Sequence, residues 1–150
     1  MKIILSGPKG VGKSTMGKRL CRLLDIPFVE TDALIEDIYR DQTGACLNCR
    51  QIFTERGEEY FRSLEVMAVE KAVAMDWCLV STGGTTLLNP LSREGLLHGS
   101  IFVLLRADDD FLWERISSGG LPPFLAGPDG RERMAERNDR LYAALCHRAD

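Results

Sequence analysis

Apolar side chains along this chain follow two different spacings. Short continuous apolar runs predict buried strands, and longer segments with an apolar side chain every three or four residues predict helices. The predicted strands cover residues 2–6, 27–31, 78–81 and 101–105. The predicted helices follow the loop at residues 7–15, cover 32–40, 47–55 and 58–75, begin at Asn89-Pro90, run from 108 through 116, and close the chain from about 131 to 147.

Two of these helices have a predicted buried face. In the helix that follows the loop at residues 7–15, this face consists of Met16, Leu20, Leu23 and Leu24. In the helix at 58–75, it consists of Phe61, Leu64, Ala68, Ala72 and Met75. Between the last two helices, residues 117–130 hold four glycines and three prolines and are predicted to form a loop.

Strands that alternate with helices predict an α/β fold, in which helices cover both faces of a parallel sheet. The length of 150 residues fits a single domain, 1–150. Ligands of such sheets bind beyond the carboxyl ends of the strands. Asp32, Gly83-Gly84 and the loop at 7–15 each follow a predicted strand. We therefore expect these segments to gather along one edge of the sheet.

The loop at residues 7–15 reads GPKGVGKST and fits the phosphate-loop spacing G-x-x-x-x-G-K-[ST]. Glycines let the backbone wrap a phosphate closely, and the helix N-terminus adds a positive dipole end. A plain glycine-rich turn is the alternative, but all fixed positions are filled and both flanks are correct. The predicted nucleotide-binding residues here are Gly10, Val11, Gly12, Lys13, Ser14 and Thr15. Lys13 is expected to reach the β- and γ-phosphates, and Ser14 to ligate Mg²⁺.

Composition and charge narrow the class of protein further. The chain is 45% hydrophobic and 27% charged, with a formal net charge of −3, which argues weakly against a nucleic-acid partner. Polar residues interrupt any apolar run near the N-terminus, and no apolar stretch approaches the roughly 18 residues of a membrane span. These patterns predict a soluble cytoplasmic protein that binds neither nucleic acid nor membrane.

The five cysteines do not form a metal-binding pattern. Cys21 and Cys78 fall in a predicted helix and strand and are expected to be small buried hydrophobes. Cys46 and Cys49 form a lone C-x-x-C, whereas structural zinc needs about four ligands. A metal or redox role for this pair is therefore disfavoured.

Five segments in order resemble the shikimate kinase family: GPKGVGKSTMGKRL, FVETDALIE, IFTERGEEYFRSLE, VSTGG and FLAGPDG. The resemblance covers nearly the whole chain and is more specific than the phosphate loop alone. It implies the phosphate-loop kinase fold, similar to nucleoside monophosphate kinases, with 117–130 as the lid loop. It also implies a monomer that uses ATP and Mg²⁺ to phosphorylate the 3-hydroxyl of shikimate, in chorismate and aromatic amino acid biosynthesis. Transfer would be in line, and the protein would supply positioning and charge neutralisation.

The resemblance assigns roles on the acceptor side of the site. It makes Asp32 the carboxylate that contacts the shikimate hydroxyls and acts as base, catalytic together with Lys13. From the residues alone, Asp32 fits a helix N-cap better. Arg62 matches the arginine that grips the shikimate carboxylate, and its alternative is a surface pair with Glu58 worth about 0.3–0.5 kcal/mol. Gly83 and Gly84 match substrate-contacting glycines.

Three further matches complete the implied site. Glu30 stands where the family often has an aspartate that orients Mg²⁺ through water. Arg115 matches an arginine that packs on the adenine ring. Arg137 is the better match for a second arginine on the substrate carboxylate, with Arg140 as its rival.

Three departures from the family pattern bear on activity. Pro122 stands where the lid carries an arginine, and such arginines are worth roughly 10³–10⁵ in rate; Arg131 and Arg133 are the nearby candidates to replace it. Thr85 replaces a third glycine, which costs about 1–2 kcal/mol if that backbone is left-handed, or adds a substrate contact through its hydroxyl.

The third departure lies at the C-terminal end. The family continues beyond residue 150 into a fifth strand and a last helix, and we expect both to be missing here. Three hypotheses follow: a shikimate kinase, impaired by loss of the lid arginine; a related small-molecule kinase with another acceptor; or a catalytically silent nucleotide-binding module.

Overall fold

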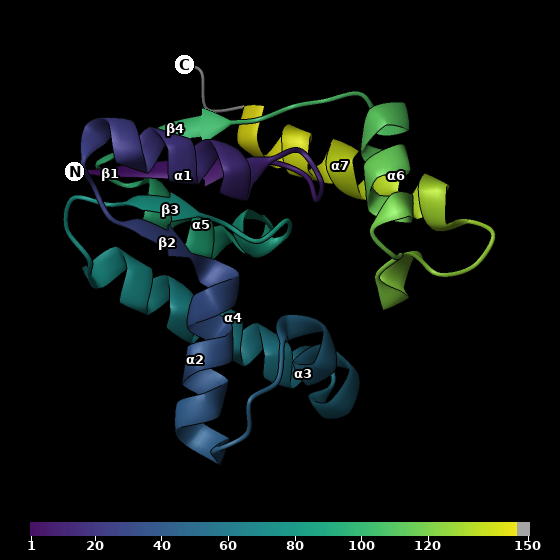
Figure 1. Cartoon of the computed structure of the whole chain (residues 1–150), viewed down its shortest axis with the longest axis horizontal. Coiled ribbons are helices and arrows are strands. Elements are labelled where there is room, and N and C mark those ends of the chain that lie inside the picture. The colour runs from purple at the N-terminus through teal and green to yellow at the C-terminus, as the bar shows by residue number, and fades with distance from the viewer. Residues whose placement is uncertain (147–150) are drawn as a thin grey trace.

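The computed structural model describes residues 1–146 and has a four-stranded sheet at its centre (Figure 1). All strand pairs are parallel, in the order β2-β3-β1-β4. The strands are β1 (Lys2–Ser6), β2 (Phe28–Glu30), β3 (Leu79–Ser81) and β4 (Ser100–Leu104). Both Glu30 of β2 and Leu5 of β1 pair with Ser81 of β3, so the carboxyl ends of these three strands lie level with one another. The predicted parallel α/β fold is confirmed.

The helices fall where the apolar spacing predicted them, with shifts of a few residues at most ends. They are α1 (Lys13–Leu24), α2 (Thr31–Thr43), α3 (Cys49–Arg56), α4 (Glu58–Ala74), α5 (Pro90–Leu97), α6 (Asp109–Ser118) and α7 (Gly130–Cys146). Two short 3₁₀ helices, η1 (Thr86–Leu88) and η2 (Pro123–Leu125), lie between them. The second falls inside the lid loop, so that segment is not wholly irregular. Residue 147, the predicted end of the last helix, lies outside the described residues.

The two faces of the sheet pack against different helices. Ile4 and Val80 belong to a buried cluster with side chains of α4, α5 and α7. On the other face, Leu5 and Leu79 pack with Cys21 of α1. Alternate residues of a strand point to opposite faces, which is why neighbours such as Ile4 and Leu5 enter different clusters. Cys21 and Cys78 are both buried, as expected.

A second layer formed by α2, α3 and α4 extends away from the sheet (Figure 1). These helices share a buried cluster that includes Ile35, Ile52 and Leu64. The α3 helix begins with a capping box, in which the Asn48 side chain accepts from Gln51 N and the Gln51 side chain accepts from Asn48 N. The predicted apolar face of α4 is confirmed, because Leu64, Ala68 and Ala72 are buried and Phe61 and Met75 are half-buried.

The predicted apolar face of α1 is wrong except at Leu20, which is half-buried and packs against the cluster of Leu5 and Cys21. Met16, Leu23 and Leu24 are exposed, whereas Gly17 and Cys21 are buried. A Cβ at Gly17 would lie 2.4 Å from Cε2 of Phe28, so β2 packs directly against the helix backbone. A strand can approach a helix this closely only where the helix carries small residues. The buried face of α1 therefore has few of the large apolar side chains from which a buried face is predicted.

The boundary between β2 and α2 also differs from expectation. Thr31 begins the helix instead of ending the strand, and the N-cap position belongs to Glu30, with no side-chain capping bond. Asp32 therefore lies inside the first turn and is not the N-cap that its position favoured on the residues alone. By contrast, the predicted cap at Asn89 is confirmed, because its Oδ1 accepts from Leu91 N and Ser92 N. Within residues 1–146, no helix combines the length and apolar character that crossing a bilayer requires.

Candidate active site

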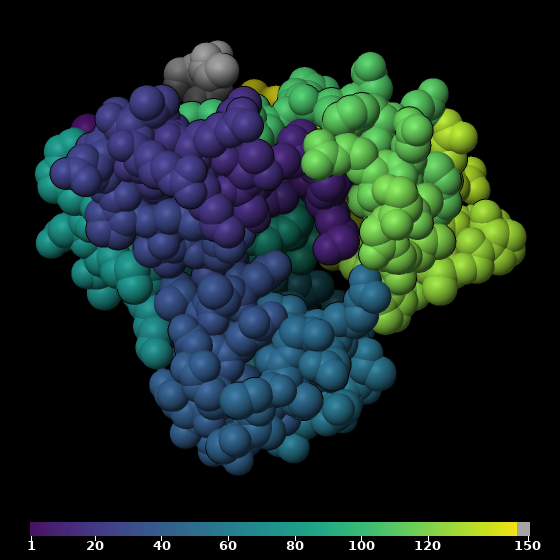
Figure 2. Space-filling view, viewed as in Figure 1, coloured from purple at the N-terminus to yellow at the C-terminus, as the bar shows by residue number. Residues whose placement is uncertain are grey.

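A cavity of about 540 Å³ opens at the carboxyl end of the sheet. Figure 2 shows this side of the molecule hollowed between the phosphate loop, the α2–α3 region and the lid loop. The predicted residues that line the cavity are Gly10, Gly12, Lys13, Ser14, Thr15, Glu30, Asp32, Arg62, Gly83, Gly84, Arg115 and Arg137. Val11 does not line it, because its side chain packs against the cluster of Leu112 and Ile116. The predicted gathering of strand ends at one edge is therefore observed.

The phosphate loop has the backbone of an anion-binding loop. Gly7, Gly10 and Gly12 have φ values of 151°, 82° and 101°, a region that favours glycine. A Cβ at Gly7 would lie 2.6 Å from the carbonyl oxygen of Leu105, so this residue must also be glycine for steric reasons. The loop leads directly into the N-terminus of α1, whose dipole favours a bound phosphate.

Lys13 folds back over its own loop. Its Nζ donates to the carbonyls of Gly7, at 2.8 Å, and Pro8, at 2.9 Å. Burial lowers the pKa of Lys13 to about 8, although the negative charge of Asp32 acts to raise this pKa. A half-buried ammonium held only by carbonyls is well placed to bind an anionic phosphate, which would raise its pKa again.

Ser14 and Glu30, the two residues predicted to serve a metal ion, contact each other directly. The Ser14 hydroxyl donates to Oε1 of Glu30. A hydroxyl and a carboxylate at the phosphate loop form an oxygen donor set that suits Mg²⁺, which usually keeps several waters and binds few protein groups. Within residues 1–146 no three His, Cys, Asp or Glu side chains gather in a metal-binding group. The residues present fit a magnesium ion that is bound mainly through nucleotide phosphates.

Asp32 lines the cavity from the first turn of α2, near Lys13 and Glu30. Burial raises the pKa of its carboxyl group, and the nearby Glu65 raises it further, whereas Lys13 lowers it. Gly83 N donates to Thr31 Oγ1 at 2.8 Å and so fixes the β3 loop against α2. The backbone of Gly83 thereby comes close to the carboxylate of Asp32, and both groups line the cavity.

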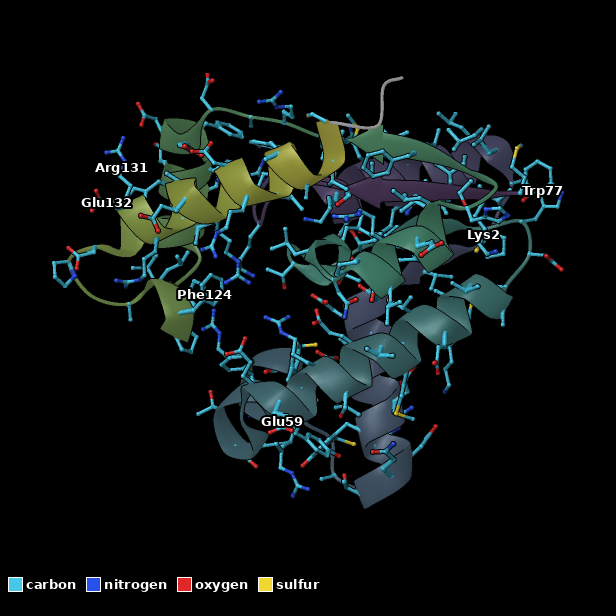
Figure 3. The ribbon with its side chains drawn as sticks, turned by 180° about the vertical axis from the view of Figure 1, so that it is seen from behind. Lys2, Glu59, Trp77, Phe124, Arg131 and Glu132 are labelled. Atoms are coloured by element: carbon cyan, nitrogen blue, oxygen red, sulfur yellow. The ribbon has the colours of Figure 1, made fainter. Side chains whose placement is uncertain are left out.

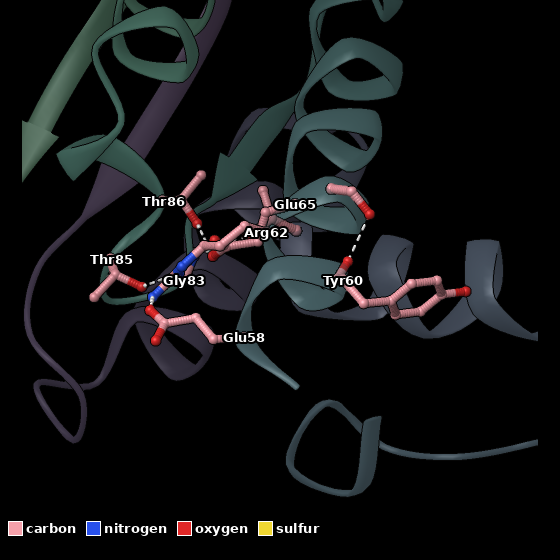
Figure 4. Close-up of polar contacts among 9 residues, drawn as sticks. Glu58, Tyr60, Arg62, Glu65, Gly83, Thr85 and Thr86 are labelled. Carbon is pink, nitrogen blue, oxygen red and sulfur yellow. Dashed lines mark hydrogen bonds and ion pairs between the residues drawn. The ribbon is translucent and has the colours of Figure 1, made fainter. Parts of the chain in front are cut away.

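Arg62 is held by three side chains (Figure 4). Its Nη1 donates to Glu65 Oε2 at 2.5 Å and to Thr85 Oγ1 at 3.1 Å, and its Nη2 donates to Glu58 Oε1 at 3.3 Å. The expected pair with Glu58 therefore exists, but it is the longest of the three contacts. Burial lowers the pKa of Arg62, but the bonds with Glu65 and Glu58 outweigh it, and the net shift is upward. Glu65 is itself buried and also accepts from Thr86 Oγ1 at 3.4 Å.

Thr85 does not impose the strain that a left-handed backbone would cause. Its φ and ψ are −123° and −5°, a conformation open to any residue. The Thr85 hydroxyl accepts a hydrogen bond from Arg62. Thr85 therefore affects the acceptor side of the cavity by occupying one donor of the Arg62 guanidinium.

Arg137 of α7 reaches the cavity, whereas Arg140 is exposed and does not line it. The guanidinium carbon of Arg137 lies 4.1 Å from the ring centre of Phe124 in the lid loop. Burial lowers the pKa of Arg137, and the nearby positive charge of Arg62 adds to this effect. The structure thus brings Arg137, and not its rival, to the acceptor half. Arg115 lines the cavity mouth and lies 5.4 Å from the ring centre of Phe111.

The two arginines considered as replacements for a lid arginine are engaged elsewhere. Arg131 pairs with Asp110, and Figure 3 shows it on the outer surface, away from Phe124. Arg133 donates to the carbonyls of Phe124, at 3.2 Å, and Ala126, at 2.5 Å. Neither lines the cavity, although Pro122 does. These two arginines stabilise the lid loop and its junction with α6 instead.

Among the cavity residues that had no part in the predicted site are Cys49 and Arg50. Cys49 lines the cavity, and its thiol donates to the carbonyl of Asp32 at 3.4 Å. Burial raises the pKa of this thiol, and the negative charge of Asp32 raises it further. Arg50, the next residue, also lines the cavity and lies within reach of the lid loop. Arg50 belongs to no motif, so only the absence of any basic side chain from the lid loop signals the need for another cation.

Comparisons with known proteins identify the family of this chain. The sequence model of the shikimate kinase family matches residues 9–149. This chain belongs to the shikimate kinase family. The shikimate kinase of Caldanaerobacter subterraneus is 36% identical over 89% of this chain and 75% of its own length. The shikimate kinase of Rhodococcus jostii is 36% identical over 90% of this chain and 76% of its own length.

Solved structures of shikimate kinases share the fold. The enzyme from Acinetobacter baumannii, solved in complex with shikimate, superposes with a TM-score of 0.81 at 28% identity, over 95% of this chain and 78% of that one. The enzyme from Aquifex aeolicus gives a TM-score of 0.76 at 29% identity, over 95% of this chain and 82% of that one. Membership of the family and the phosphate-loop kinase fold, both expected from the sequence, are confirmed.

Proposed function

We propose that this shikimate kinase family member transfers the terminal phosphoryl group of ATP to the 3-hydroxyl of shikimate. The observation that carries the proposal is that one cavity holds the phosphate loop, the carboxylate of Asp32 and the guanidinium of Arg62. A phosphate donor and an anionic polyhydroxyl acceptor need this combination of charges. The relatives named shikimate kinase supply the identity of the acceptor.

On the donor side, the backbone of the phosphate loop and Lys13 bind the ATP phosphates. The Lys13 ammonium leaves the Gly7 and Pro8 carbonyls for the β- and γ-phosphate oxygens. Ser14 and Glu30 would hold Mg²⁺ at the phosphates. When bound, this ion would supply positive charge against the charge that develops on the transferring phosphoryl group. Arg115 at the mouth of the cavity packs on the adenine ring.

On the acceptor side, Asp32 binds the hydroxyl groups and takes the proton of the attacking 3-hydroxyl. The oxygen of that hydroxyl forms the new bond to the γ-phosphorus, and the bond from the γ-phosphorus to the bridging oxygen of ADP breaks. The raised pKa of Asp32 makes its carboxylate a better proton acceptor than an exposed aspartate. Gly83 and Gly84 allow the ring of the acceptor to approach the backbone.

Arg62 and Arg137 bind the carboxylate of the acceptor. Both line the same half of the cavity, and each lowers the electrostatic cost of bringing a negatively charged acceptor next to ATP. Arg62 is already oriented by Glu65, Glu58 and Thr85, so little rotamer entropy is lost when it binds. One chain supplies both halves of the cavity, which is consistent with a monomer. The cytoplasmic location stays a prediction.

A related kinase with a different acceptor is the second candidate. Thr85 occupies one donor of Arg62, and Pro122 brings no charge to the lid side of the cavity. Both features would suit an acceptor that depends less on a carboxylate. A catalytically silent nucleotide-binding module is the third candidate, motivated by the same proline.

ADP release by the whole chain, measured with ATP and Mg²⁺ in the presence and absence of shikimate, tests these candidates. We expect shikimate-dependent release, and we expect Asp32→Asn to abolish it while ATP binding persists. Release that depends on another polyhydroxyl compound, but not on shikimate, would favour the second candidate. ATP binding without turnover on any acceptor would favour the third.

A further inference from the structure

The lid loop, residues 117–130, contains no lysine or arginine. Its contributions to the cavity are Pro122, Pro123, Phe124 and Leu125, which carry no charge. A phosphoryl group in transfer bears negative charge, and kinases surround it with cations. The lid side of this cavity therefore needs a cation from another element.

Arg50 approaches the lid loop from the opposite side of the cavity. It belongs to α3, and its Nη2 lies 3.5 Å from the carbonyl oxygen of Gly120. That contact joins residues 70 positions apart in the sequence and bridges the mouth of the cavity. Figure 2 shows atoms of the α3 region in contact with atoms of the lid loop below the hollow. The contact is long for a hydrogen bond, so a bound anion can draw the guanidinium inward at little cost.

Three other cations of the cavity already contact protein groups. Lys13 lies on the phosphate loop, Arg62 is held by two glutamates and Thr85, and Arg137 stacks on Phe124. Among the described residues, no carboxylate lies within ion-pair distance of Arg50. A guanidinium has five N–H donors, and the Gly120 carbonyl takes one. Arg50 thus has donors and an unneutralised charge to offer at the mouth.

We propose that Arg50 is a positioning residue for phosphoryl transfer, which closes the lid loop from the acceptor side and supplies the positive charge that this loop lacks. One N–H group holds the Gly120 carbonyl, and the remaining donors face the anionic ligands in the cavity. Closure then depends on the ligands, because their negative charge pulls Arg50 and the lid loop together. The proposal rests on the proposed function only for the identity of the ligands.

Steady-state kinetics of three variants test the role in turnover. Arg50→Ala is expected to lower kcat/KM for the acceptor at least about tenfold, as the loss of a charge-assisted contact does. Arg50→Lys keeps the charge and is expected to recover part of the loss. Arg56→Ala is the matched control, since Arg56 lies on the same helix and stacks on Tyr60 at 4.7 Å, outside the cavity lining. Equal kinetics for Arg50→Ala and Arg56→Ala would overturn the proposal.

A rescue experiment tests whether the missing element is a cation at the lid. Pro122→Arg combined with Arg50→Ala is expected to restore most of the lost activity, because it returns a guanidinium to the same side of the cavity. Pro122→Ala combined with Arg50→Ala is the control and is expected not to. Equal activity of the two combinations would mean that Arg50 acts by some means other than its charge at the lid.

A readout without turnover separates this proposal from the proposed function. The chain has two tryptophans, and Trp113 packs against the cluster that contains Leu125 of the lid loop. In a Trp77→Phe background, a non-hydrolysable ATP analogue is expected to change Trp113 fluorescence in the Arg56→Ala variant and to change it much less with Arg50→Ala. If shikimate elicits no ADP release, the proposed function fails and this comparison still tests Arg50. An unchanged fluorescence response in Arg50→Ala would contradict the role in closure.

Discussion

A Cβ at residue 83 would lie 2.9 Å from Oδ1 of Asp32 and 3.0 Å from Oγ1 of Thr86. Gly83 therefore sets how closely the β3 loop approaches the proposed catalytic carboxylate. The glycine is needed here for space, since its φ is not in the left-handed region.

Gly83→Ala is expected to displace Asp32 and lower kcat with shikimate at least about tenfold, since small errors in geometry cost large factors in rate. ATP affinity is expected to change less than kcat, because the atoms that a Cβ at residue 83 would meet belong to Asp32, Thr86 and Thr31 and not to the phosphate loop. Gly95→Ala is the control: its nearest neighbour would be Val73 Cγ2, at an ordinary 3.5 Å. Loss of ATP binding in Gly83→Ala, measured by calorimetry, would contradict this account.

Arg62→Ala is expected to raise KM for shikimate much more than KM for ATP. It removes a carboxylate-binding group and leaves Glu65, which is 8% exposed, without its partner. An unpaired buried charge also destabilises a fold, so we expect a lower melting temperature. Glu58→Gln is the control, because it weakens only the long, exposed contact with Arg62. Equal losses for both substrates would point to a purely structural role.

Thr85→Gly is expected to lower KM for shikimate a few-fold. It frees the Nη1 donor that Arg62 directs to the Thr85 hydroxyl, and the backbone there tolerates glycine. Thr85→Ser keeps the hydroxyl and is expected to behave like the parent protein. If Thr85→Gly instead raises KM, the hydroxyl itself contacts the acceptor.

Pro122→Arg is expected to raise turnover with shikimate roughly tenfold if the lid cation limits the rate. Pro122 has φ −65° and ψ 154°, an extended conformation that arginine adopts freely. Pro122→Ala, which removes the ring without adding charge, is the control. A drop in turnover with Pro122→Arg would indicate a lid loop adapted to another acceptor.

The lowered pKa of Lys13, about 8, predicts two opposite pH effects. Above pH 8 the free enzyme loses the Lys13 charge, so kcat/KM for ATP is expected to fall as the pH rises. This fall begins at a pH well below the ordinary pKa of lysine. Between pH 8 and about 10.5 the unfolded chain binds the proton that the folded one has lost, so this group makes stability rise with pH. Denaturant titrations and pH–rate profiles of the parent and Lys13→Met measure both effects; if the two proteins share the same stability profile, the shift is absent.

Local patterns in the sequence were sufficient for the strands, the helices and the phosphate loop. Residues within a few positions of one another determine the phosphate loop, the apolar face of α4 and the Asn89 cap. Their spacing is therefore visible in the sequence. The prediction for the buried face of α1 failed because tertiary packing determines that face. Phe28 packs onto Gly17, and close packing against a glycine leaves no apolar mark in the helix itself.

The acceptor half depended on contacts between distant segments. The family resemblance named Asp32, Arg62 and Arg137, but only the folded chain distinguished Arg137 from Arg140 and joined Arg62 to Thr85. The approach of Arg50 to Gly120 had no counterpart in the sequence, because strand order and helix packing set which side chains meet across a cavity. The sequence determined the phosphate loop and the helices and strands around it, since these rest on short-range spacing. Tertiary structure decided which cations face the acceptor and the lid, since those positions rest on packing between elements far apart in the chain.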